Sequence, residues 1–306
     1  MIPCSDPTTP MPTDTTTGSD SPWWRDSRAG PLVVAGIALV ASGLIHLAVW
    51  GILGGSWEGP VSWRKPILFG ISAGLTGLSL GWVFAAVPRR RGDDPIAVAT
   101  AWAIVVEVAL IDLQCWRGVA SHFNRSTTFD SVLYDAMGVL ILLVTATAAW
   151  LTLRSFRGGL AQPADMQLAT QAGLVFLLAS SALGVVVSVY GDLRVAAGLP
   201  PESFGAAGVP KFPHGAVIHA LQWLPALAWL ARRAGLEVAT RTRLVGLATL
   251  GTGCFGTYAL LQTLLGRARF DTTPATAVLL AIGVGALALP MAVIAQAILK
   301  ANPRAG

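Results

Sequence analysis

Eight long apolar segments, each close to the length of a membrane-spanning helix, constrain this chain more than any other feature. A helix that crosses the hydrocarbon core of a bilayer needs about 20 largely apolar residues, at ~1.5 Å of rise per residue. The segments are residues 31–53, 66–87, 95–116, 131–153, 168–190, 213–231, 244–265 and 275–299. They predict an all-α, polytopic membrane helix bundle of about eight transmembrane helices.

The charge content excludes other classes of protein. Only 12% of the 306 residues are charged, against roughly 25% in a soluble domain. The net charge of +5 comes from arginines scattered in pairs rather than from one basic patch. The chain as a whole is therefore neither a soluble globule nor a disordered segment, and we expect the lipid bilayer, and no nucleic acid, as its partner.

Both ends of the chain differ from the apolar region between them. Residues 1–29 are rich in Thr, Ser, Pro and Asp, and such a stretch cannot bury enough apolar surface to order itself. We expect residues 1–29 to be a disordered cytoplasmic tail, residues 30–300 the transmembrane helical domain, and residues 301–306 a short cytoplasmic tail. The three cysteines show no metal-ligand spacing, so no metal site is predicted.

The basic residues orient the predicted spans. Cytoplasmic connections carry an excess of Lys and Arg. Thirteen of the 21 basic residues fall on the side of both termini: Arg25, Arg28, Arg89, Arg90, Arg91, Arg154, Arg157, Arg232, Arg233, Arg241, Arg243, Lys300 and Arg304. The other eight fall on the opposite side, so the N- and C-termini are predicted to be cytoplasmic.

The connections on the opposite, extracytoplasmic side hold most of the unusual polar residues. Loops carried by a rigid scaffold are where binding residues concentrate. We interpret the polar residues in and beside these loops as candidate ligand-binding groups. They are Lys65, Gln114, Arg117, His122, Asn124, Asp130, Asp135, Asp192, Arg194 and His214. Asp192 and Arg194 are close enough in sequence to form an ion pair at the membrane interface.

A few polar residues lie deeper within the spans. Glu107 is ten residues before Arg117, which places it about 15 Å below the outer boundary on a continuous helix. His46, His219 and Gln222 lie at a similar depth, and His219 and Gln222 share a helical face. Polar groups at this depth are costly and are often functional. We therefore assign Glu107, His219 and His46 as candidate catalytic residues and Gln222 as a ligand-binding residue.

Local patterns predict two features of packing. Gly70, Gly74, Gly77 and Gly81 form a small-residue stripe that lets another helix approach closely. Pro225 removes a backbone donor, which predicts a kink beside His219 and Gln222. Asp112 is rotated by about 140° from Glu107 around the helix, so it is not included in the site.

Three segments resemble a family of bacterial multi-pass integral membrane proteins to which no activity is assigned. They are WEGPVSWRKPILFGIS, QCWRGVASHFNRSTTFD and GDLR followed by FPHGAVIHALQWLP. The resemblance runs from the first predicted helix to the sixth. It implies a multi-pass topology in a bacterial inner or plasma membrane and implies no reaction.

Three functions remain open. In the first, a polar pocket in the extracytoplasmic half binds or converts a lipid-like or isoprenoid substrate, with Glu107 as general acid, His219 or His46 as base, and Lys65, Arg117 and Arg194 facing an anionic headgroup. In the second, Glu107 serves a proton-coupled transporter or channel. In the third, His46 and His219 are the axial ligands of a b-type haem. The sequence identifies neither a substrate nor a cofactor.

Overall fold

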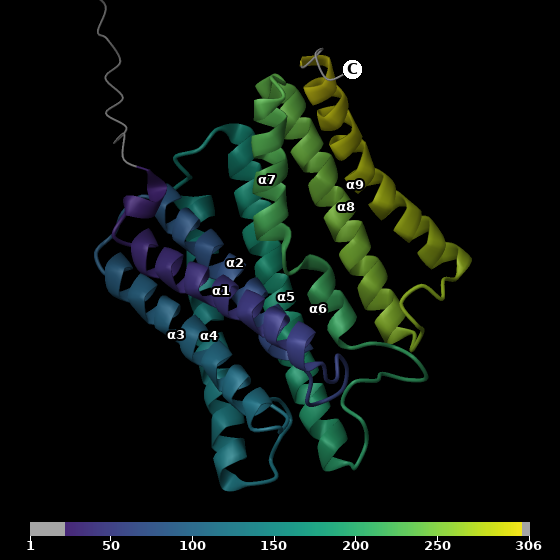
Figure 1. Cartoon of the computed structure of the whole chain (residues 1–306). Coiled ribbons are helices and arrows are strands. Elements are labelled where there is room, and N and C mark those ends of the chain that lie inside the picture. Colours follow the sequence, from purple (N-terminus) through teal and green to yellow (C-terminus); the bar gives the residue numbers. More distant parts are fainter. Residues whose placement is uncertain (1–21, 302–306) are drawn as a thin grey trace, which may run out of the picture.

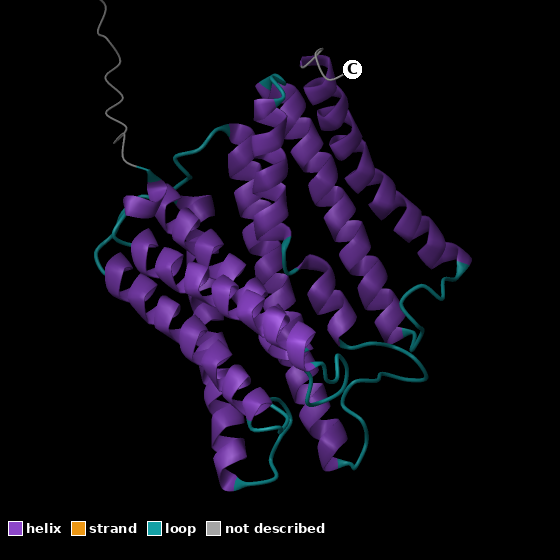
Figure 2. Ribbon diagram, in the orientation of Figure 1, coloured by secondary structure: helices purple, strands orange, loops and turns teal. Residues whose placement is uncertain are grey.

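The structure, a computed structural model, describes residues 22–301, and this range contains helices and no strand (Figure 2). The elements are η1 (Trp23–Arg25), α1 (Ala29–Leu53), α2 (Arg64–Ala86), α3 (Asp93–Trp116), α4 (Thr128–Arg157), α5 (Ala164–Ala196), α6 (Lys211–Val217), α7 (Ala220–Arg233), α8 (Val238–Leu264) and α9 (Pro274–Ala301). Seven of these helices are long and apolar enough to cross a membrane. The protein is an all-α polytopic membrane bundle, as the sequence predicts.

The described part of the chain crosses the bundle eight times. The seven long helices make seven crossings, and α6 and α7 together make another, because they lead from the end where α5 finishes to the end where α8 begins. The first and last described helices therefore start and finish at the same end (Figure 1). We call this end, which holds most of the basic residues, the arginine-rich end, and we call the opposite one the loop end.

The helices form two groups, α1 to α4 and α5 to α9 (Figure 1). One apolar core runs through the first group and reaches Leu174 and Leu177 of α5, and a second core joins α5, α7, α8 and α9. The groups meet where α4 packs against α5 and where α2 packs against α7. The seam between α2 and α7 is the thinner of these contacts.

The glycine stripe of α2 packs closely against α1, as predicted. A Cβ atom on Gly74 would lie 2.6 Å from the Gly36 carbonyl oxygen, and one on Gly70 would lie 2.9 Å from the backbone of Gly43. Any side chain at these positions would separate the two helices. The stripe is therefore structural, and it fixes the position of α2 against α1.

The sixth crossing is not the continuous helix that the sequence predicts. Residues 213–231 are interrupted at Ile218 and His219, where α6 has ended and α7 has not begun. Pro225 lies inside α7, six residues after His219, so the interruption is a feature separate from the kink predicted at this proline, which stays a prediction. The interruption lies within the depth of the bundle. His219, its second residue, directly precedes α7 and lies three residues before Gln222.

Small residues on α5 pack against both halves of the broken crossing. A Cβ atom on Gly173 would lie 2.6 Å from the Leu221 Cα, so only glycine lets the first turn of α7 sit this close. Two turns further along α5, the Ser180 hydroxyl donates to the His214 carbonyl (3.0 Å), and the His214 ring donates from Nδ1 to the Ser180 carbonyl (2.8 Å). Thus α5 holds each half-helix separately, and the hydroxyl serves a carbonyl near the broken end of α6.

The helices begin and end close to the predicted limits, except that α4 and α5 extend further at both ends and α8 begins six residues earlier, at Val238 instead of 244. Of the predicted tail, residues 1–21 lie outside the described residues, whereas η1 and α1 occupy residues 23–25 and 29 onward. Ordered chain therefore begins before residue 30. Residues 302–306 also lie outside the described part.

Candidate functional site

Asp130 organises the loop end between α3 and α4. Its Oδ1 accepts from Gln114 Nε2 (2.9 Å) and from the Arg117 guanidinium (2.7 Å), and Arg117 also donates to Gln114. Its Oδ2 accepts from the Thr127 hydroxyl (2.7 Å), which in turn caps the Asp130 backbone N–H. With Phe129 under the Arg117 guanidinium, this network joins the end of α3 to the start of α4.

Arg125 connects the same loop to α4 and α5. It forms ion pairs with Asp135 (2.9 Å) and Asp192 (3.5 Å) and lies over the Tyr134 ring. The predicted pair of Asp192 with Arg194 is wrong. Arg194 instead donates to the Pro200 carbonyl (3.3 Å), because its side chain points toward the loop that follows α5.

His122 and Asn124 shape the α3–α4 loop itself. The Asn124 side chain donates to the Ala120 carbonyl and accepts from Ser126, so its polar atoms stabilise the turn. His122 lies against Phe69 and Tyr134, with its Nδ1 2.9 Å from the Ser121 hydroxyl. Burial, followed by the nearby positive charges of Lys65 and Lys211, lowers the pKa of His122 to about 3. This imidazole is therefore neutral at physiological pH.

His46 belongs to a seam between α1 and α3. Its Nδ1 donates to the Ser42 carbonyl (2.9 Å), and its Nε2 accepts from the Trp116 indole (3.0 Å). The Ser42 hydroxyl also donates to Asp112 (3.3 Å), whose other carboxylate oxygen is buried and has no hydrogen-bond partner among residues 22–301. Both ring nitrogens of His46 are therefore occupied within the protein.

His219 and Gln222 form a second polar seam, between α7 and α2. The His219 Nδ1 lies 3.3 Å from the Gln222 amide oxygen, which confirms that the two residues share a face. The His219 Nε2 lies 3.3 Å from the Ser72 hydroxyl, and the Gln222 Nε2 donates to the Ser79 hydroxyl (3.0 Å). Four side chains thus form one hydrogen-bonded chain beside the break in the sixth crossing.

Glu107 stands apart from both seams. It is a buried residue of α3 with an exposed fraction of 8%, and no hydrogen bond or ion pair involves its carboxyl among the described residues. Within that same part of the chain, no contact joins Glu107, His46 and His219 into one constellation. The acid–base roles predicted for them therefore stay predictions, and the structure adds no hydrogen bond in their favour.

The donor set does not fit a haem held by His46 and His219. An axial ligand needs a free ring nitrogen. Both nitrogens of His46 and both nitrogens of His219 face hydrogen-bond partners, and the two rings lie in different seams. Within residues 22–301, no group of three or more His, Cys, Asp or Glu side chains is arranged to hold a metal ion.

The α2–α7 seam carries an open groove with a volume of about 250 Å³. Its walls come from the second half of α2, the first turns of α7 and η1. They are formed by Leu75, Leu78, Ser79, Trp82, Leu221, Gln222, Pro225 and Trp23. Six of the eight are apolar or aromatic, and the bonded pair of Gln222 and Ser79 supplies the polar groups. The groove lies in the arginine-rich half, whereas the sequence predicts a pocket in the other half.

Several buried polar residues lie outside the sequence-based predictions. Asp93 is completely buried between Arg28 (3.1 Å) and Arg154 (2.8 Å) at the arginine-rich end. Arg241 forms a similar ion pair with buried Asp165 (2.9 Å). Charged residues at both helix starts and helix ends could have suggested these pairs. Ser72 and Ser79 give no comparable signal, because hydroxyls are common in membrane helices.

Comparisons with known proteins give one partial likeness. Over 77 residues, or 25% of this chain, the sequence is 39% identical to a protein of Rhodopseudomonas palustris (strain BisB18) that is named as part of an NADH-quinone oxidoreductase. The matching stretch spans 23% of that protein's length. No protein-family model matches the chain. No solved structure matches it.

Proposed function

We propose that this protein binds a lipid-like molecule in the α2–α7 groove. The observation that carries the proposal is a groove of about 250 Å³ at membrane depth whose apolar walls contain one hydrogen-bonded polar pair, Gln222 and Ser79. Ligand sites have this composition: mostly apolar, with a few polar groups that orient the ligand. The volume is slightly below the ~300 Å³ of a typical drug-sized pocket, which suits part of a chain whose remainder lies in the bilayer.

The groove favours a ligand with a neutral polar group. Its lining contains no lysine, arginine or acidic residue among the described residues. Gln222 and Ser79 offer an amide and a hydroxyl, which pair with carbonyl or hydroxyl groups. Isoprenoid alcohols and isoprenoid quinones have this chemistry. The partial likeness to a protein named as part of a quinone oxidoreductase supports the quinone as the first molecule to test.

The groove also has a way in from the lipid phase. It is an open depression rather than an enclosed cavity, and Trp23 and Trp82 flank it toward the arginine-rich end. Tryptophan is enriched at the membrane–water interface, where its ring lies among the headgroups. A ligand that diffuses in the bilayer therefore enters sideways, between α2 and α7.

Binding of decylubiquinone to the purified full-length protein tests the proposal. Trp23 and Trp82 line the groove, so their fluorescence should be quenched on binding. Leu78→Trp fills the groove and should weaken binding by about tenfold or more, which corresponds to about 1.4 kcal/mol. Leu68→Trp makes the same change on an exposed position of α2 outside the groove and should leave binding unchanged. Equal binding by both variants, or none by the wild type, would contradict the proposal.

Glu107 supports a second candidate, proton-coupled transport. A buried carboxyl without a partner among the described residues is costly in a membrane, and such groups mark proton pathways. If Glu107 carries the proton, Glu107→Gln should abolish proton flux into proteoliposomes that contain a pH-sensitive dye. It should leave quinone binding in the groove intact, so the two candidates are separable.

A further inference from the structure

The hydrogen bond between Trp116 and His46 is a polar link between two transmembrane helices at the loop end. The Trp116 indole Nε1 lies 3.0 Å from the His46 Nε2. Trp116 is the last residue of α3, and His46 lies about two turns before the end of α1. Both rings also lie against the ring of Trp63, the residue that precedes α2. This hydrogen bond therefore lies where three transmembrane helices meet.

The partners of the His46 ring determine where its hydrogen lies. A backbone carbonyl only accepts hydrogen bonds, so the Nδ1 that faces the Ser42 carbonyl (2.9 Å) carries the hydrogen. An indole N–H only donates, so the Nε2 that faces Trp116 has a free lone pair. The bond between the two rings therefore exists only while the imidazole is neutral, because a proton on Nε2 would place two N–H groups face to face.

Asp112 of α3 supplies a negative charge beside the ring. The Ser42 hydroxyl oxygen lies 3.4 Å from the His46 Nδ1 and 3.3 Å from the Asp112 Oδ2. The other carboxylate oxygen, Oδ1, is buried and has no hydrogen-bond partner among residues 22–301. His46 itself is 7% exposed, and a charged ring that is buried to this extent needs an opposite charge nearby. Asp112 is placed to provide that charge.

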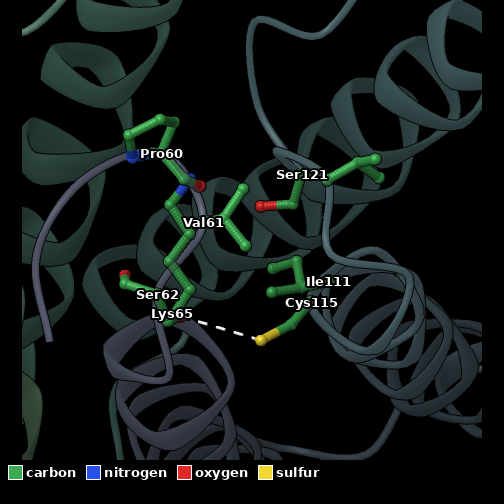
Figure 3. Close-up of a pocket in the computed structure, with 8 residues that line it drawn as sticks. Pro60, Val61, Ser62, Lys65, Ile111, Cys115 and Ser121 are labelled. Atoms are coloured by element: carbon green, nitrogen blue, oxygen red, sulfur yellow. Dashed lines mark hydrogen bonds between the residues drawn. The ribbon is translucent and has the colours of Figure 1, made fainter. Parts of the chain in front are cut away.

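Three further titratable groups belong to the helices that pack here. At the end of α3, the Cys115 thiol donates to a backbone carbonyl of the connection before α2 (3.8 Å; Figure 3). In the first turn of α2, the Lys65 ammonium donates to another carbonyl of that connection (2.7 Å). Glu107 lies further along α3 and forms no hydrogen bond or ion pair with a described residue. Asp112 is therefore the charged group that is linked to His46.

We propose that the hydrogen bond between His46 and Trp116 is a pH-sensitive latch between α1 and α3. While His46 is neutral, its Nε2 accepts the indole hydrogen and joins the two helices at the loop end. Histidine changes its charge within the physiological range of pH, and a proton on Nε2 removes the acceptor. The indole is then released toward the surface, where 57% of Trp116 is already exposed. The Asp112 carboxylate stabilises the imidazolium that forms.

The latch is separate from the proposed function. None of its residues lines the α2–α7 groove, which lies in the arginine-rich half. The loop end is the side that the sequence predicts to be extracytoplasmic. The latch therefore responds to the pH on that side of the membrane.

The indole N–H signals of the full-length protein in detergent test the latch. Tryptophan is labelled with ¹⁵N, and the signals are followed by NMR from about pH 8 to about pH 5. Trp116→Phe and Trp50→Phe identify the two signals of interest. The Trp116 signal should move from a hydrogen-bonded to a water-exposed chemical shift as the pH falls. Trp50 is the matched control, because its indole donates to the Gly55 carbonyl (3.2 Å), which does not titrate in this range. A Trp116 signal that stays in place overturns the proposal.

Two variants test the assigned groups. His46→Gln offers an amide oxygen to the indole but takes up no proton, so the Trp116 signal should become independent of pH. Asp112→Asn removes the charge that stabilises the imidazolium, so the transition should move to lower pH by about one unit or more. If His46→Gln folds poorly, Asp112→Asn still tests the latch. A pH-dependent Trp116 signal in His46→Gln, or an unmoved transition in Asp112→Asn, contradicts the proposal.

Discussion

At the scale of single residues, Glu107 shows how burial without a partner shapes a membrane protein. The side chain is 8% exposed and has no polar contact within the described residues. A fixed charge near the bilayer centre costs about 2.5–3.5 kcal/mol on insertion scales. We expect Glu107→Gln, which is neutral and of the same shape, to keep the melting temperature of the purified protein within a few degrees. Glu107→Lys should lower the yield of folded protein strongly. A large loss in Glu107→Gln would show that the carboxyl has a partner.

His122 predicts how the stability of the loop end depends on pH. Burial is the main cause that lowers its pKa from the ordinary 6.5 to about 3 in the folded protein. Below pH 6.5 the unfolded chain binds a proton that the folded chain does not, so the free energy of unfolding falls as the pH decreases. The slope is up to about 1.4 kcal/mol per pH unit from this group. Melting curves between about pH 7.5 and pH 5 should show this loss in the wild type, and His122→Phe should reduce it. An unchanged slope would contradict the prediction.

Residue identity alone predicts where polar groups gather but not which ones meet. The loop-end candidates do occupy the loop end, and His219 does face Gln222. Yet Asp192 pairs with Arg125, on another connection, rather than with its near neighbour Arg194. A prediction from the sequence pairs residues that lie a few positions apart. The ion pair of Asp192 with Arg125 forms only once α4 and α5 have packed. Asp112 is left out of the predicted site because it points away from Glu107 on the helix, and its contact with Ser42 forms only when α1 packs against α3.

At the scale of elements, Gly173 decides whether α7 can take its place. A Cβ atom there would lie 2.6 Å from the Leu221 Cα, and backbone cannot move aside as a flexible side chain can. Gly173→Leu should therefore destabilise the protein by at least the ~1–3 kcal/mol typical of overpacking. The control is Gly138→Leu, a helical glycine of α4 with no described atom within 4 Å of its Cβ position. Size-exclusion profiles and melting temperatures should separate the two variants, and similar behaviour would contradict the role of Gly173.

The helices themselves are largely predictable from the sequence, and the broken crossing is not. Hydropathy locates a long apolar helix because the contribution of each residue to the mean hydropathy of a segment does not depend on which residues lie beside it in the folded protein. It places seven spans close to their observed limits. At the interruption at Ile218 and His219, Gly173 and Ser180 of α5 contact α7 and α6. Pro225 is the strongest local signal, and it lies inside α7, whereas the contacts with α5 join residues far apart in the sequence.

At the scale of the whole molecule, the buried ion-pair cluster of Asp93, Arg28 and Arg154 joins distant parts of the chain. Asp93 begins α3, Arg28 precedes α1, and Arg154 lies near the end of α4. Because all three side chains are buried, removing the central charge leaves buried Arg154 without a carboxylate, whereas Arg28 keeps its ion pair with Asp26 (2.7 Å). Asp93→Asn should cost about 3–5 kcal/mol of stability.

The residue next to Asp93 provides the matched control. Asp94 pairs with Arg89 at the exposed surface, with 43% of its side chain accessible, so Asp94→Asn should cost less than about 1 kcal/mol. Thermal or denaturant unfolding of the two variants in the same detergent measures the difference. Equal destabilisation would show that the buried ion-pair cluster contributes no more to stability than a surface ion pair does.

The break between α6 and α7 has a consequence for how the protein is made. Each half is far shorter than the ~20 residues that let a helix partition into lipid by itself, with 7 residues in α6 and 14 in α7. Nascent α6 and α7 therefore have no stable position in the bilayer until α5 is already there to receive them. The second half should therefore insert in a fixed order. We expect α5 to be in the bilayer first, and α6 and α7 to leave the translocation machinery by packing against it.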